Sequence, residues 1–166
     1  SIILKVDDGN RYLQEAVNNV FMQSFSDFEL LVLKEGANYE DTLDGMDTID
    51  MRLRILNVVS FEEPGVWGQV MESIKGKYVV LMDAGHLMVP RKLHTQFSFM
   101  EDHRDVDVCG TWVTENGKQH WTYLRSTRRK LGSANKDTFS PVRISNNTSG
   151  ILAKRYPFII KSVHIS

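Results

Sequence analysis

Apolar positions in the first two thirds of the chain switch repeatedly between the spacing of strands and the spacing of helices. Short apolar runs predict strands at residues 1–6, 28–33, 52–58, 78–82 and 106–110. Apolar residues three and four positions apart predict helices that begin after Asn10, Pro64 and Pro90, with a weaker helix at 41–49. Strands that alternate with helices are typical of a mostly parallel α/β sheet with helices on both faces.

Each of the three main predicted helices has one apolar face. The first face is predicted to hold Tyr12, Leu13, Ala16, Val17, Val20 and Phe21. The second holds Val66, Trp67, Val70, Met71 and Ile74 and is expected to stop at Gly76, and the third holds Leu93, Phe97 and Met100. These faces are expected to pack on the sheet, so Trp67 is interpreted as a core residue.

The pattern weakens after residue 110. Strands at 111–114 and 120–124 with Asn116-Gly117 between them predict a hairpin, and residues 156–166 contain one more candidate strand. A basic run (125–130) and a polar, loop-like stretch (132–150) separate these segments. We therefore expect a single domain over residues 1–166 whose last part, 111–166, is small, irregular and β-rich.

Acidic residues follow three of the predicted strands. They lie in the loops that begin with Val6-Asp7-Asp8, Lys34-Glu35 and Asp83-Ala84. In parallel sheets, ligands bind in the crevice beyond the carboxyl ends of the strands. The three loops are therefore expected to meet at one edge of the sheet and to form the site.

Composition narrows the function classes. The chain has 166 residues and a formal net charge of −1, which gives no electrostatic reason to expect nucleic-acid binding. Its single cysteine, Cys109, excludes an intrachain disulfide and fits a reducing compartment. No run approaches 18 apolar residues and the first residues lack a signal-peptide pattern, so we expect a cytoplasmic protein, with docking at the inner face of the membrane as an alternative.

Two blocks of the sequence resemble the family 2 glycosyltransferases of the GT-A fold. They are SIILKVDDGNRYLQEAVNNVFMQSFSDFELLVLKEG (1–36) and SIKGKYVVLMDAGHLMVPRKLHTQFSFMEDHRDVDVCG (73–110). The resemblance covers residues 1–110 well and the last third loosely. It implies a GT-A, Rossmann-like fold whose first part (1–110) binds a nucleoside-diphosphate sugar and whose remainder (111–166) lies on the acceptor side. The implied activity is sugar transfer to an acceptor glycan or lipid-linked glycan, as in polysaccharide biosynthesis.

The resemblance also implies site residues. The donor would contact Val6, Asp7, Asp8, Glu35, Asp83 and Ala84. Asp83 matches the first residue of the family's Asp-x-Asp motif, which usually holds a divalent cation, Mn or Mg. The second Asp falls on Gly85 and the next on His86, so Asp83 and His86 are the candidate metal ligands and metal binding is expected to be weak or missing.

Other departures from the family leave alternatives open. Val66-Trp67-Gly68 stands where the family has Ala-Arg-Asn, and no catalytic base can be assigned. A catalytically inactive GT-A-like module that binds a nucleotide or a partner is therefore one alternative. A response-regulator receiver is a remote one, with Asp83 as phosphoacceptor. Asp83, Asp7 and Asp8 could also serve only to cap turns or helices. The sequence leaves the oligomeric state open.

Overall fold

The computed structural model describes residues 1–6, 12–36, 50–63, 65–106, 108–109, 112–115, 118–121 and 151–154. Within these ranges one sheet has the strand order β3-β2-β1-β4-β8-β5. Its strands are β1 (Ile2–Val6), β2 (Leu30–Glu35), β3 (Leu53–Val58), β4 (Tyr78–Asp83), β5 (Val108–Cys109) and β8 (Ile151–Lys154). A separate antiparallel pair joins β6 (Trp112–Glu115) to β7 (Lys118–Trp121).

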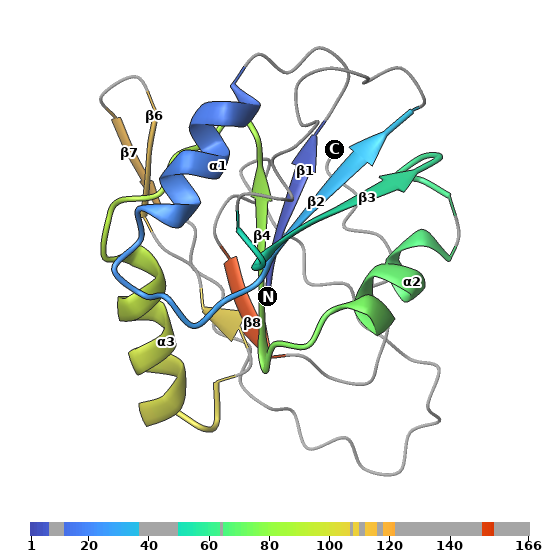
Figure 1. The fold of residues 1–166 in the computed structure, drawn as a ribbon. Coiled ribbons are helices and arrows are strands. Elements are labelled where there is room, and N and C mark those ends of the chain that lie inside the picture. Colours follow the sequence, from blue (N-terminus) through green and yellow to red (C-terminus); the bar gives the residue numbers. More distant parts are fainter. Residues whose placement is uncertain are drawn as a thin grey trace, which may run out of the picture.

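The four strands that come first along the chain are parallel to one another. β1 pairs with β2 and with β4, and β2 pairs with β3. β8 runs antiparallel to β4 and to β5 and lies between them. Figure 1 shows the sheet at the centre with α1 (Leu13–Phe21) and α3 (Lys92–Asp102) on one side and α2 (Val66–Ser73) on the other. The predicted α/β architecture, a mostly parallel sheet with helices on both faces, is confirmed.

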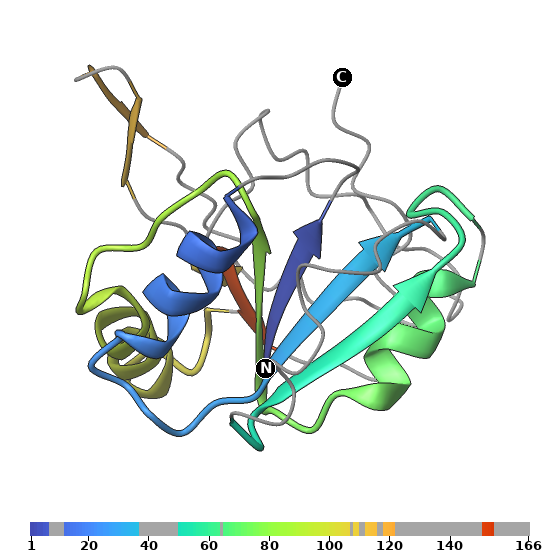
Figure 2. The same cartoon turned by 45° about the horizontal axis from the view of Figure 1, so that its top comes forward.

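Successive side chains along each strand point to opposite faces of the sheet, and this produces two cores, one on each face. Ile2, Leu4 and Val6 of β1 point to the side of α1 and α3, where Leu13, Val20 and Met100 are buried with them. The next residue along, Ile3, points to the side of α2. There it packs with Leu31, Leu33, Val66, Val70, Ile74 and Val79. Figure 2 shows from a second direction that α1 and α3 cover one face of the sheet and α2 the other.

Several predicted boundaries and positions differ from the structure. Tyr12 precedes α1 and is 46% exposed, so its predicted place on the buried face is wrong. Helix α2 ends at Ser73 because Ile74 is extended, and Gly76 instead lies close against the backbone of Ser1. Strand β8 was not predicted, since its four residues follow a long polar stretch.

The predicted hairpin is confirmed, with its second strand beginning two residues earlier than expected. Glu115 pairs with Lys118, so two residues separate the strands, where the predicted bounds left five. The expected helix at 41–49, the turn pair Asn116-Gly117 and the candidate strand in 156–166 lie outside the described residues.

Candidate functional site

The carboxyl ends of three neighbouring strands meet at one edge of the sheet, as the sequence predicted. In the parallel register Lys5 lies opposite Asp83, Val6 lies opposite Lys34, and Glu35 lies opposite Val58. The loops that follow these strands therefore begin side by side. We call this the carboxyl edge; Figure 1 shows it at the tips of the β1, β2 and β4 arrows.

Three charged side chains lie on the same face of the sheet at this edge. Lys5 is two residues after Ile3, Glu35 two after Leu33, and Asp83 two after Leu81. Ile3, Leu33 and Leu81 all pack on the side of α2. Because side chains two positions apart on a strand share a face, the three charged residues continue that face beyond the core.

Asp83 forms an ion pair across the strands. Its Oδ1 is 3.4 Å from the Lys5 Nζ, and both side chains are partly exposed, Lys5 by 24% and Asp83 by 32%. The Ala84 N–H donates to the Lys5 carbonyl at 3.1 Å, which fixes β1 and β4 at this point. Sequence reasoning missed Lys5; its position two residues after a buried isoleucine in a strand was the available signal.

His86 returns towards Asp83 through a tight turn. The His86 N–H donates to the Asp83 carbonyl at 3.0 Å, and this turn brings the ring Nδ1 to 3.9 Å from Asp83 Oδ2. That separation is too long for a hydrogen bond. Nδ1 is buried and has no hydrogen-bond partner among the residues that the structure describes. The structure thus places the two candidate metal ligands, His86 and Asp83, near each other.

Glu35 is held by the segment that leads into α2. The Phe61 N–H donates to Glu35 Oε1 at 3.2 Å, and the Trp67 Nε1–H donates to the Phe61 carbonyl at 3.2 Å. The Phe61 ring lies 5.2 Å from the Lys5 Nζ, within the range of a cation–π contact. Phe61, which the sequence analysis did not select, thus connects Glu35, Trp67 and Lys5.

The remaining predicted donor residues offer different groups. The side chains of Val6 and Ala84 are buried in the core on the side of α1, so a ligand could contact only their backbone groups. The Ala84 N–H is already bonded to Lys5. Asp7 and Asp8 lie outside the described residues.

Among the described residues, the side chains at this edge do not make up the ligand set of a divalent cation. A hard cation takes about six oxygen ligands, of which the protein usually supplies several. In the described ranges no three His, Cys, Asp or Glu side chains are grouped to hold a metal ion. Asp83 and His86 offer two donors, Gly85 offers no side chain, and the Lys5 ammonium group occupies one side of the carboxylate.

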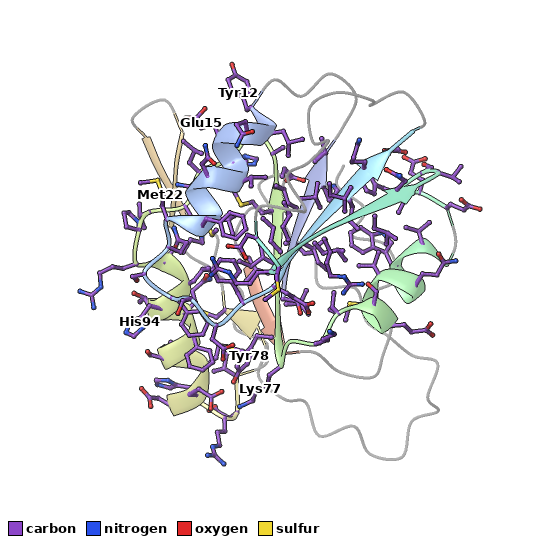
Figure 3. All side chains as sticks on the ribbon, viewed as in Figure 1. Tyr12, Glu15, Met22, Lys77, Tyr78 and His94 are labelled. Atoms are coloured by element: carbon purple, nitrogen blue, oxygen red, sulfur yellow. The ribbon has the colours of Figure 1, made fainter. Side chains whose placement is uncertain are left out.

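A cavity of about 520 Å³ lies at the opposite edge, where the strands begin. Its lining includes Ser1, Phe28, Arg52, Lys77 and Tyr78. Figure 3 shows Lys77 and Tyr78 at the start of β4, far from the carboxyl edge. We place the site at the carboxyl edge because ligands of parallel sheets bind there.

The helices in the described part of the chain were also compared with the length and hydropathy of a membrane span, and none reaches both.

Comparison with known protein sequences gives one family match and several similar relatives. The sequence profile described as "Glycosyl transferase family 2" matches residues 1–158. An uncharacterised glycosyltransferase of Methanocaldococcus jannaschii is 24% identical over 123 residues, which is 70% of this chain and 42% of that protein. The O-antigen biosynthesis glycosyltransferase WbnJ of Escherichia coli is 23% identical over 124 residues, 71% of this chain and 48% of that protein. The chain thus spans less than half the length of these two relatives.

The fold is also that of solved glycosyltransferase structures. S. aureus TarS, residues 1–349, matches with a TM-score of 0.60 and 15% identity over 93% of this chain and 47% of that one. TarS in complex with UDP-GlcNAc matches with a TM-score of 0.56 and 20% identity over 71% of this chain and 36% of that one. At these identities the likeness establishes the GT-A-type fold alone.

Proposed function

The chain belongs to glycosyltransferase family 2, and from this premise we propose that the protein transfers a sugar from a nucleoside-diphosphate sugar to an acceptor glycan or lipid-linked glycan. The observation that carries the proposal is the meeting of Lys5, Glu35 and Asp83 at the carboxyl edge, where this type of sheet binds ligands. The TarS complex supports it, because that relative in fold binds UDP-GlcNAc. A receiver function is not favoured, since the family profile covers residues 1–158.

Glu35 is the proposed contact for the base of the donor. Its Oε1 is fixed by the Phe61 N–H, which leaves the second carboxylate oxygen to accept a hydrogen bond from a base. Asp83, Lys5 and the backbone of Val6 and Ala84 lie at the neighbouring strands, where the diphosphate and sugar would follow. The loop residues Asp7 and Asp8 remain proposed donor contacts.

Each part of the chain has a proposed role, and the protein has a proposed place in the cell. We assign residues 1–110 to donor binding and 111–166 to the acceptor side. The proposed setting is the cytoplasm, with the inner face of the membrane as the place where a lipid-linked acceptor would be met. A divalent cation held by Asp83 and His86 is the competing arrangement.

A nucleotide panel tests donor binding. The melting temperature of the chain is measured with uridine, guanosine, cytidine and thymidine diphosphates, each with chelator, Mg²⁺ and Mn²⁺. One nucleotide is expected to raise the melting temperature, since a ligand that binds only the folded state stabilises it. Glu35→Gln should reduce that rise and leave the ligand-free melting temperature nearly unchanged. Failure of all four nucleotides in all three buffers would contradict the proposal.

A catalytically inactive nucleotide-binding module is the second candidate. Gly85 in place of the second motif Asp and Val66-Trp67-Gly68 in place of Ala-Arg-Asn favour it. The two candidates differ in turnover. An active enzyme releases nucleoside diphosphate from a donor sugar when an acceptor is present, whereas an inactive module binds the same donor and releases none.

A further inference from the structure

The Lys5 ammonium group occupies a fixed position at the carboxyl edge. Its Nζ lies 3.4 Å from Asp83 Oδ1 and 5.2 Å from the centre of the Phe61 ring. Lys5 and Asp83 are register partners of β1 and β4, and the Ala84 N–H donates to the Lys5 carbonyl. Two central strands therefore hold the backbone of Lys5, while its partly exposed side chain stays within reach of a ligand.

Asp83 thus has a positive partner from the chain itself. A divalent cation on the same carboxylate would come within a few ångströms of the ammonium group, and like charges at that distance repel strongly. His86 is the one neighbouring donor in the described residues, and Gly85 adds none. The side chains around Asp83 therefore suit the Lys5 ammonium group better than a bound metal ion.

We propose that the Lys5 ammonium group takes the place of a divalent cation at Asp83 and binds the diphosphate of the nucleotide directly. This inference rests on the function proposed above. An ammonium group offers three N–H donors and a full positive charge, and lysine is a common phosphate ligand. The Phe61 ring beside it helps to hold the ammonium group in place, because the face of an aromatic ring attracts cations.

The role of Lys5 is electrostatic. The ammonium group transfers no proton and forms no covalent bond; it offsets negative charge on the diphosphate while that group is bound and as it leaves the sugar. Asp83 then serves to hold Lys5 at the edge when no nucleotide is present. Nucleotide binding is expected not to require a metal ion.

Calorimetric titration of uridine diphosphate into the 166-residue chain tests this arrangement, in EDTA, Mg²⁺ and Mn²⁺. If another nucleoside diphosphate stabilises the chain best, it replaces uridine diphosphate. The unaltered chain is expected to bind with similar affinity in all three buffers. Lys5→Met should weaken binding in EDTA by about 10-fold or more, and Lys5→Arg should retain most of it. Lys75→Met, which removes an exposed positive charge at the opposite edge, is the matched control and should have no effect.

Asp83→Asn separates the two arrangements by the sign of its effect. If Lys5 binds the diphosphate, removing its negative partner should leave affinity in EDTA unchanged or make it about 2- to 5-fold tighter. If Asp83 holds a metal ion, the same substitution should abolish metal-dependent binding. A gain in affinity cannot come from a misfolded variant, so this result stands even if Lys5→Met unfolds the chain.

Three results would overturn the inference. Binding that requires Mg²⁺ or Mn²⁺ and is lost in Asp83→Asn places a metal at Asp83, and the proposed transferase function still stands. A preference for Mn²⁺ over Mg²⁺ that His86→Ala removes identifies His86 as a metal ligand. Absence of binding in every buffer removes both this inference and the proposed donor site.

Discussion

At the scale of single residues, Glu29 connects three segments through hydrogen bonds and an ion pair at the edge opposite the candidate site. Its carboxylate accepts hydrogen bonds from the Ser1 hydroxyl and from the N–H groups of Lys75 and Gly76, and it lies 3.5 Å from Arg54. Burial alone raises the pKa of Glu29. The hydrogen bonds from Lys75, Ser1 and Gly76 outweigh burial, so its pKa lies below the usual 4.5.

This lowered pKa predicts acid sensitivity. A carboxylate whose pKa is lower in the folded state stabilises the fold above pH 4.5, and the stabilisation is lost as the pH falls through the lowered value. Glu29→Gln should cost about 1–2 kcal/mol at pH 7 and should flatten the fall in stability below pH 4.5. Urea unfolding between pH 3 and pH 7 measures both effects.

Glu15→Gln is the control for Glu29. Glu15 is an exposed carboxylate on α1 (Figure 3), and its replacement should change stability by less than about 0.5 kcal/mol. Equal acid sensitivity of the Glu29→Gln variant and the unaltered chain would contradict the lowered pKa of Glu29 as a source of the acid sensitivity.

At the scale of the element, two glycines, one just before α2 and one inside it, differ in backbone conformation and not in surrounding space. Gly65 precedes the helix and has a φ of +103°, a backbone conformation that residues other than glycine rarely adopt. Gly68 lies inside the helix. An added Cβ would have no atom within 4 Å at either position. Steric room therefore cannot explain any difference between alanine substitutions at the two sites.

Alanine is expected to have opposite effects at these two positions. Gly65→Ala should destabilise the fold by about 1–2 kcal/mol, because it strains the backbone where α2 begins. Gly68→Ala should stabilise it by about 0.5–1 kcal/mol, because alanine favours a helix interior over glycine. Urea unfolding of both variants is the measurement. Effects of the same sign would contradict this account of how α2 starts.

At the scale of the whole molecule, the sheet has two edges with different features. The carboxyl edge holds Lys5, Glu35 and Asp83, whereas the cavity of about 520 Å³ lies at the amino ends of the strands. The two sites are separated by the length of the strands, so a bound nucleotide protects one and not the other. Hydrogen exchange distinguishes them.

Uridine diphosphate, or the nucleoside diphosphate that binds best, is expected to slow amide exchange at the carboxyl edge. The affected peptides should include residues 34–36, 60–61 and 83–86, while residues 27–29 and 75–78 beside the cavity should be unchanged. Mass spectrometry of exchanged chain with and without nucleotide measures this. Protection confined to residues 27–29 and 75–78 would place the nucleotide in the cavity instead.

The sequence by itself determined the order of the described strands and helices from β1 to β7 and the edge at which to look. Apolar runs and helical spacing depend on neighbouring residues, so strands such as 78–82 and buried positions such as Leu13 and Met100 could be predicted directly. The meeting of the carboxyl ends of β1, β2 and β4 followed from parallel strands alone. The family resemblance added the expected donor class, which the profile match over residues 1–158 supports.

Only the tertiary structure decided which side chains meet at that edge. The pairing of Lys5 with Asp83 depends on the register of β1 against β4, and the bond from Phe61 to Glu35 joins residues 26 positions apart. The insertion of β8 between β4 and β5 likewise depends on contacts between distant segments. A local pattern carries no information on the register of residues 78 positions apart, because register is set when the packed faces of separate strands come together.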